Sequence, residues 1–528
     1  MCVCSGFKNL ASRSKVFFTC GSYSSFFLNP QIPPFHPGSL IFHAIKFSLL
    51  VVVATLLLPA SGRAWEVDTH EELTEQAINI KEGELNTYLK NNLGLEGGLN
   101  EVVDEKTVRE WMIEGSNTED NGIRFVNYFH EPLSNLGSRI FSGISVIEWS
   151  LKSVGAQGGE DSYSWNDARE YYFKALTSPT KSERDENWGK TFRALGQVMH
   201  LLQDSANPSH VRDDPHPSLF GVGDVDGLHD YMEGQSVVSY PGATFFTPDP
   251  SLLQSEHSGG PPDPLANLFD TNTYNGNNPG ATLGTDVGIT EYTSANFFSD
   301  DTIPGQSGTV LPLFPNAFEL VPAPVPLPYL TLPRLGSPTF PAARAAKLTG
   351  NQAVATFLLT NTNFDLIGKL QLDDGVYDAQ AQNLIPRAID YSAAVLDYFF
   401  RGQLQVALHE FEVLGTTLGA GLCDPTPDPV VDDGLLEVEF TIPSDLNFDG
   451  TASLYYEQDE TRVLVAERTN SPSGEKFSMS GNILYASLDD PVQWYVVLDG
   501  DAGPGVQEQP RAIVATSDKA AWEFVCLE

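Results

Sequence analysis

The spacing of apolar residues changes once along this chain, at the Pro- and Asp-rich stretch CDPTPDPVVDDG that spans residues 423–434. Before this stretch, apolar residues recur at steps of three and four, which predicts amphipathic helices. After it, short segments rich in Val, Tyr and Ile are separated by turn residues, which is typical of antiparallel strands. The sequence therefore predicts a multidomain protein, with an all-α helical domain followed by a small all-β, sandwich-like domain.

The helical domain is expected from residue 65 to about residue 415. Its clearest helical patterns before residue 240 are THEELTEQAINI, TVREWMI, WNDAREYYFKAL and ENWGKTFRALGQVMHLLQD. Frequent Pro and Gly from about residue 240 to 345 prevent long regular elements, so we interpret this part as an extended insertion or lid. Helical spacing returns in PAARAAKLTGNQAVATFLL and in PRAIDYSAAVLDYFFRGQLQVALHEF, and the second segment is long enough to complete a helical bundle.

We expect a linker at residues 416–434 and the β domain at residues 435–528. One stretch of the β domain, DLNFDG, resembles the start of a calcium-binding loop, with Asp445, Asn447 and Asp449 at alternating positions before Gly450. The twelfth position of such a loop would be Tyr456, where a Glu is required. A polar turn between strands is therefore the favoured interpretation, and calcium binding is the alternative.

Residues 1–64 contain neither Asp nor Glu and include the apolar run FSLLVVVATLLLPA. This run is too short for a membrane span of about 20 residues, but it suits the core of a secretory signal peptide. Gly62 and Ala64 suit signal-peptidase cleavage, so we expect a mature chain that begins at Trp65 and is secreted, either to the periplasm or outside the cell. The part before the apolar run is unusually long, which indicates a translation start assigned too far upstream.

Cleavage before Trp65 would leave two of the five cysteines, Cys423 and Cys526, in the mature chain. An exported protein allows a disulfide between them, and two free thiols are the alternative. Neither cysteine lies in a motif typical of a catalytic nucleophile.

The chain is strongly acidic, with 69 Asp and Glu against 30 Lys and Arg and a formal net charge of −39. This balance argues against a partner such as double-stranded nucleic acid, because such binding depends on Lys and Arg that neutralise phosphates. A solvated acidic surface explains much of the charge. If the protein handles phosphate, something other than its side chains must supply the positive charge.

Histidines and carboxylates recur at a spacing of four residues in two places. In HLLQDSANPSH, His200 and Asp204 lie four apart on one face of a helix, and Pro208 ends the helix before His210. In LHDYMEG, His229 and Glu233 repeat the same spacing. Imidazole and carboxylate groups are the usual ligands of open zinc sites, so the combination predicts a metal centre.

With these motifs the chain resembles the zinc-dependent phospholipase C superfamily, which includes bacterial phospholipases C and single-strand-specific zinc nucleases. The resemblance covers about residues 65–240 and implies a cluster of three zinc ions. It also implies that the free amine and carbonyl of an N-terminal Trp65 bind one zinc together with His70 and Asp204. The remaining ligands that it implies are His200, His210, His229 and Glu233.

Two positions match the superfamily less closely. In the superfamily an Asp approaches the metals and acts as a base, and Asp120 fits this role, with Glu119 as a competitor. A histidine ligand is then expected shortly before an acidic–Pro pair, but the stretch YFHEP places Tyr128 there. Either His130 replaces it from two residues away, which we favour, or one zinc is weakly held or absent.

The activity that the resemblance implies is hydrolysis of a phosphate ester by a metal-activated water, with Asp120 as the catalytic base. Glu233 is typical of the phospholipases, whereas the short distance from Trp65 to His70 is typical of the nucleases. The acidic charge disfavours long polyanions, so we expect phospholipase C-like hydrolysis of phospholipid head groups with transient contact to a membrane surface. The alternatives are a single-strand-specific zinc nuclease and a non-catalytic secreted binding protein with a residual metal site.

Overall fold

The computed structural model describes most of the chain after residue 66. The described ranges are 67–121, 124–138, 143–158, 162–214, 226–240, 263–284, 286–304, 314–322, 328–335, 344–350, 369–401, 403–404, 434–442, 448–472, 476–483, 492–502, 513–517 and 520–522. The predicted signal peptide, Trp65, the linker before Gly434, Cys423 and Cys526 lie outside these ranges. None of the described helices has the length and apolar character needed to cross a membrane.

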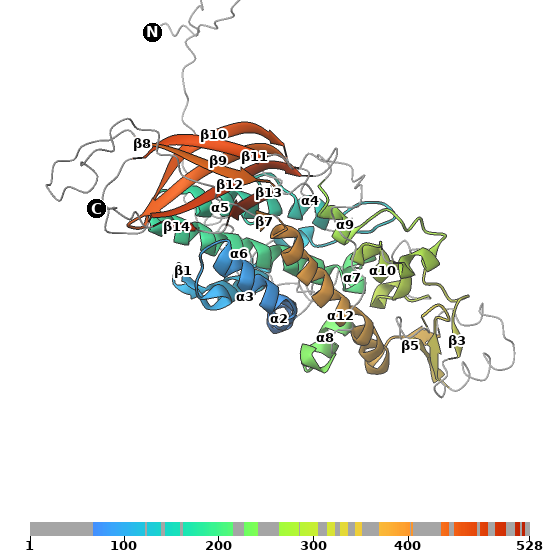
Figure 1. The fold of residues 1–528 in the computed structure, drawn as a ribbon. Coiled ribbons are helices and arrows are strands. Elements are labelled where there is room, and N and C mark those ends of the chain that lie inside the picture. Colours follow the sequence, from blue (N-terminus) through green and yellow to red (C-terminus); the bar gives the residue numbers. More distant parts are fainter. Residues whose placement is uncertain are drawn as a thin grey trace, which may run out of the picture. The chain divides into compact units, whose positions relative to one another are not determined.

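Helices form the first part of the described chain, as the spacing of apolar residues predicts (Figure 1). The longer ones are α2 (Val67–Asn91), α3 (Val108–Thr118), α5 (Trp165–Thr177), α6 (Lys181–Asp204) and α12 (Asp374–Phe399). The shorter ones are α4 (Val146–Ser150), α7 (Pro208–Val211), α8 (Gly227–Met232), α9 (Ala266–Phe269) and α10 (Ile289–Asn296). Single 3₁₀ turns are η1 (Gly98–Asn100), η2 (Arg124–Asn127), η4 (Val237–Ser239), η6 (Pro279–Leu283) and η7 (Asp300–Thr302). Helix α6 packs against α2, α3, α5 and α12, so it is the centre of the helical region.

Side-chain caps define where three of these helices begin. Each of α3, α5 and α6 starts with a capping box, in which the N-cap side chain and the residue three positions later satisfy each other's backbone N–H groups; the pairs are Thr107 and Glu110, Ser164 and Asp167, and Thr180 and Glu183. A cap of this kind stabilises a helix by about 1 kcal/mol. Asn207 caps α7 and Pro208 lies in its first turn, so His210 is in a short second helix rather than in the turn after α6.

Helices α3 and α6 approach each other through two glycines. A Cβ atom on Gly196 would lie 2.0 Å from the carbonyl oxygen of Met112, and one on Gly115 would lie 2.1 Å from the carbonyl oxygen of Arg193. Only residues without a side chain allow this backbone contact. The contact brings the C-terminal end of α3 next to the last turns of α6.

The region predicted as an insertion or lid is partly a packed component of the core. The elements between residues 263 and 304 are short, as the Pro and Gly content predicts, but Leu268, Phe269, Ile289 and Phe297 are buried. Helix α10 packs against α7 and α12. For these residues the interpretation as a lid is therefore wrong, because their apolar side chains fill the interior instead of covering a site from outside.

A small antiparallel sheet corrects another helix prediction. Its order is β3 (Val321–Pro322), β4 (Tyr329–Thr331), β5 (Arg344–Leu348) and β6 (Leu370–Gln371). Strand β5 lies in the segment PAARAAKLTG, whose Ala content favours a helix, but pairing on both sides and burial of Ala345, Ala346 and Leu348 outweigh that local preference. The long final helix also ends early, since α12 stops at Phe399 and residues 403–404 form strand β7.

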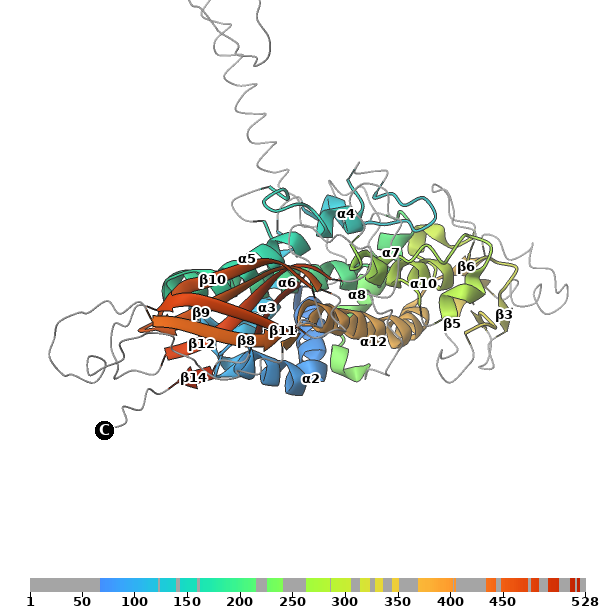
Figure 2. The same ribbon diagram turned by 45° about the horizontal axis from the view of Figure 1, so that its top comes forward.

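Strands form the last part of the described chain, as predicted (Figure 2). They are β8 (Gly434–Thr441), β9 (Phe448–Gln458), β10 (Thr461–Pro472), β11 (Lys476–Ile483), β12 (Val492–Ala502), β13 (Ile513–Ser517) and β14 (Ala520–Trp522). One sheet has the order β10-β9-β12-β13-β7 with β14 also on β12, and β11 pairs with β8 separately. All these pairs are antiparallel except β13 with β7. Asp449 and Gly450 lie in β9 with partners on both sides, whereas Asp445 and Asn447 lie outside the described residues, so calcium binding stays an untested alternative.

Candidate metal centre

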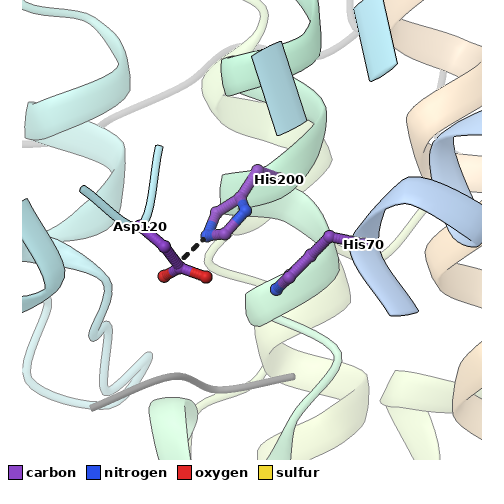
Figure 3. A group of neighbouring side chains, drawn as sticks. All are labelled: His70, Asp120 and His200. Atoms are coloured by element: carbon purple, nitrogen blue, oxygen red, sulfur yellow. Dashed lines mark ion pairs between the residues drawn. The ribbon is translucent and has the colours of Figure 1, made fainter. Parts of the chain in front are cut away.

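Five predicted site residues from four separate segments meet in the interior of the helical region. His70 comes from the first turns of α2, Asp120 from the segment directly after α3, His200 and Asp204 from the last turns of α6, and His210 from α7. All five are buried, with exposed fractions from 0 to 5%. We refer to His70, Asp120, His200, Asp204 and His210 as the histidine–aspartate cluster. Figure 3 shows the carboxylate of Asp120 directed at the ring of His200, with the ring of His70 beside it.

The carboxylate of Asp204 lies at the Nε2 edges of the two stacked histidine rings and is shared by them. Its Oδ1 is 3.3 Å from His70 Nε2, and its Oδ2 is 3.2 Å from His200 Nε2. Asp120 Oδ1 approaches the same His200 nitrogen at 3.6 Å, and Asp204 Oδ2 lies 3.9 Å from His210 Nδ1. The rings of His70 and His200 are 3.8 Å apart between centroids. As the four-residue spacing predicts, His200 and Asp204 lie together on one face of α6.

The hydrogen bonds behind the two rings define which nitrogen faces the carboxylates. His200 Nδ1 lies 2.6 Å from the carbonyl oxygen of Ser116, which can only accept, so this nitrogen carries the hydrogen. His70 Nδ1 lies 2.7 Å from Oε1 of Gln203, whose amide nitrogen contacts the hydroxyl of Thr74 at 2.9 Å. In the neutral form of each ring, Nε2 is therefore a bare acceptor.

Bare nitrogens that face carboxylate oxygens can be satisfied by a proton on the ring or by a metal ion between the two groups. Among the described residues, His70 Nε2, His200 Nε2 and both carboxylate oxygens of Asp204 are buried and make no hydrogen bond. Burial without a partner costs about 1–3 kcal/mol for each polar group and more for charged groups. Each oxygen of Asp204 faces one ring nitrogen, so the four atoms could bind metal ions.

The electrostatics of the metal-free cluster agree with this need for positive charge. Burial lowers the pKa of His200, but the carboxylates of Asp204 and Asp120 raise it, and the resulting pKa is about 9. Burial alone would raise the pKa of Asp204, but His200 and His210 hold it well below its usual range. Asp204 is therefore ionised at neutral pH, as a metal ligand must be.

Asp120, not its neighbour Glu119, faces the cluster. Glu119 is buried, and its two carboxylate oxygens accept hydrogen bonds from Arg124 Nη2 (2.6 Å) and Trp149 Nε1 (2.8 Å). One ligand atom from each of His70, Asp120 and His200 lies within 4.8 Å of the other two. The geometry thus distinguishes two candidates between which the sequence leaves a choice.

His130 does not present a nitrogen to the cluster. Its Nδ1 lies 2.8 Å from the hydroxyl of Ser145, and its Nε2 lies 2.8 Å from Oδ2 of Asp270. Metal binding at His130 would have to displace one of these buried partners. The prediction that His130 replaces the ligand missing at Tyr128 therefore finds no support in the geometry, because neighbours distant in the sequence already use both ring nitrogens.

His229 and Glu233 belong to a second group at α8. Ligand atoms of His229, Asp230 and Glu233 lie within 4.8 Å of one another, and His229 Nδ1 is 3.6 Å from Asp230 Oδ1. Asp230 and Glu233 are exposed, unlike the members of the histidine–aspartate cluster. This second group could also hold a metal, and Asp230 was not predicted as a member.

Sequence reasoning also missed the residues that orient the rings. Gln203 is polar and buried in a helix, directly before Asp204, and this combination is a signal that could have been noticed. The carbonyl of Ser116 carries no such signal, because any residue at that position would provide a carbonyl. Trp65 lies outside the described residues, so its predicted role stays a prediction.

Comparisons with known proteins leave the family of this chain open. No family model matches the sequence, and no curated protein matches it at a significant level. Among solved structures, the alpha toxin from Clostridium absonum matches at 10% sequence identity and a TM-score of 0.25, over 86% of this chain and 97% of the toxin. A TM-score this low carries no argument about fold or function, so the site must be interpreted from its own geometry.

Proposed function

We propose that this protein is a secreted zinc-dependent phosphodiesterase that hydrolyses phospholipid head groups in the manner of a phospholipase C. The observation that carries the proposal is the histidine–aspartate cluster, in which bare imidazole nitrogens and ionised carboxylate oxygens face one another in the interior. A buried arrangement of this kind is costly for a protein that uses it only for packing. Metal binding explains both its burial and its lack of hydrogen bonds.

The donor set and its spacing support zinc. Two ligands of a tetrahedral zinc, each about 2.0–2.2 Å from the ion, lie about 3.4 Å from each other. The separations from Asp204 oxygens to His70 Nε2 and His200 Nε2 are 3.3 and 3.2 Å, and that from Asp120 to His200 is 3.6 Å. Imidazole and carboxylate ligands also suit zinc better than magnesium or calcium.

We propose that Asp204 bridges two zinc positions. One would be held by His70 together with the amine of Trp65, and the other by His200 and Asp120. His229 and Glu233 would hold a third ion together with His210. This set follows the resemblance described above, without His130.

Zinc would polarise the phosphoryl oxygens of a substrate and lower the pKa of a bound water toward about 7. The residues of the chain would position the metal ions and the water and accept the proton. Asp120 would orient the attacking water and accept its proton, and Asp204 would hold both metal positions at a constant separation. The positive charge at the centre would allow an anionic substrate to bind despite the net charge of −39.

The test combines metal content with two substrates. Mass spectrometry of metals in the purified protein should find zinc, and phosphatidylcholine vesicles should yield diacylglycerol. Single-stranded DNA is assayed in parallel, because nucleotide release without diacylglycerol would replace the lipid substrate by nucleic acid. A protein that contains no zinc and remains inactive with added zinc would contradict both activities and favour a binding protein.

A further inference from the structure

Glu119 is held at both its side chain and its backbone, directly before Asp120. Arg124 and Trp149 donate to its carboxylate, as described above, and the hydroxyl of Tyr128 donates to its carbonyl oxygen. Its own backbone N–H donates to the carbonyl of Gly115 at 3.3 Å. Asp120 therefore follows a residue that has little freedom to rotate.

Tyr128 is well suited to this contact. It is fully buried, and its hydroxyl donates to the carbonyl oxygen of Glu119, which can only accept. Its ring also contacts the ring of His200 edge-on, with centroids 5.3 Å apart. Tyr128 consequently touches the segment that carries one ligand and the ring that provides another.

We propose that Tyr128 and Glu119 are positioning residues, which aim the carboxylate of Asp120 at His200 through the backbone between residues 119 and 120. Tyr128 then stands at its position as a support for the metal centre and not as a lost ligand. The proposal rests on the proposed metal function, because Asp120 is positioned for an ion. It gives a role to Tyr128, which stands where the ligand pattern of the superfamily has a histidine.

Two variants remove hydrogen bonds at opposite ends of Glu119. Tyr128→Phe removes the phenol oxygen from the Glu119 carbonyl, and Trp149→Phe removes the indole N–H from its carboxylate. Matched controls remove the same chemical groups elsewhere in the helical region. Tyr88→Phe removes a buried hydroxyl that contacts Tyr172 at 3.0 Å, and Trp111→Phe removes an indole N–H that donates to Val103 at 2.8 Å.

The measurements are zinc affinity and the visible absorption bands of the cobalt(II)-substituted full-length protein, which report ligand geometry. We expect Tyr128→Phe to weaken zinc binding about tenfold, as loss of outer hydrogen bonds to metal ligands typically does, and to shift the cobalt bands. Trp149→Phe should shift them in the same way, and both controls should leave them unchanged. Wild-type affinity and bands in Tyr128→Phe and Trp149→Phe would overturn the proposal, as would equal effects in the controls.

These readouts separate the positioning role from the enzymatic one. If the wild type binds metal and Tyr128→Phe weakens that binding, the positioning role stands even when neither lipid nor DNA is hydrolysed, and only the proposed activity fails. If the wild type binds neither zinc nor cobalt, both proposals fail.

Discussion

Two buried clusters of charged residues, one centred on α6 and one between the helices and the last sheet, differ in how their polar atoms are satisfied. The second, which we call the arginine–glutamate cluster, consists of Arg184, Glu457 and Arg462. Arg184 and Arg462 are 4% and 7% exposed, so they are about as buried as the histidine–aspartate cluster. Glu457 accepts from Arg184 at 3.0 Å and from Arg462 at 2.6 Å.

Further donors of the arginine–glutamate cluster are directed at partners in the described chain. Arg184 also donates to the carbonyls of Ser178 and Pro179, and Arg462 donates to the carbonyl of Leu176. None of the three side chains has a buried atom without a hydrogen bond. The arginine–glutamate cluster satisfies its buried polar atoms with protein partners, which is typical of a structural ion pair, whereas the histidine–aspartate cluster contains buried polar atoms without a hydrogen bond.

The largest expected effect comes from Asp204→Asn, because the amide cannot offer two anionic oxygens to two ions. We expect the loss of most bound zinc and a fall in activity of about 1,000-fold or more, which corresponds to at least about 4 kcal/mol. Metal analysis and initial rates check this. Glu457→Gln is the control, since it neutralises a partly buried carboxylate in the other cluster and should keep its zinc. Full activity in Asp204→Asn would exclude the site.

In contrast to Asp204→Asn, Arg462→Met should lower the stability of the fold and leave zinc binding unchanged. Breaking one partner of a buried ion pair costs about 3 kcal/mol, and the carbonyl of Leu176 would also lose a donor. Denaturant unfolding should show this loss, while zinc content per folded chain remains that of the wild type. Unchanged stability of the variant would mean that the ion pair of Arg462 does not stabilise the fold. A loss of zinc would mean that the two clusters are coupled.

Zinc itself should stabilise the protein. Free zinc at 100 times its dissociation constant adds about 2.7 kcal/mol to the free energy of unfolding, provided that the unfolded chain does not bind it. Thermal unfolding with a chelator and with zinc measures the difference. The same increment is expected in Arg462→Met, because distant sites contribute additively; in Asp204→Asn the increment should disappear.

The smallest effect is the pH dependence of zinc affinity. The pKa of His200 in the metal-free cluster is about 9, and zinc binds only the neutral ring. His200 is therefore protonated below this pH, and zinc must displace the proton. Affinity should fall about tenfold, or about 1.4 kcal/mol, for each unit that the pH decreases below this value. Competition titrations at several pH values check this, and an affinity that is constant between about pH 7 and 9 would contradict it.

Elements that depend on nearby residues could be predicted from the sequence, whereas those that depend on distant partners could not. The helices α3, α5 and α6 and most strands of the last sheet were predictable, because apolar spacing and capping residues act within a few positions. Strand β5 was not, because its pairing partners lie in separate segments, β4 before it and β6 after it. Local alanine content points to a helix there, and only the sheet overrides it.

The same distinction applies within the metal centre. The spacing of His200 and Asp204 in α6 was enough to predict that the two side chains meet, since a helix brings positions four apart together. The prediction of His130 as a ligand finds no support in the geometry, because Ser145 and Asp270, which contact its nitrogens, lie far from it in sequence. Nothing in the stretch YFHEP indicates those partners.

The sequence by itself determined the change from helices to strands near residue 434 and the identity of most ligand candidates, because both depend on local periods. The tertiary structure decided which ring nitrogens are bare, which carboxylate of the pair Glu119 and Asp120 faces them, and what Tyr128 holds. All three features depend on hydrogen-bond partners that come from different segments of the chain. Such partners exist only once α2, α3 and α6 have packed through contacts that no local pattern records.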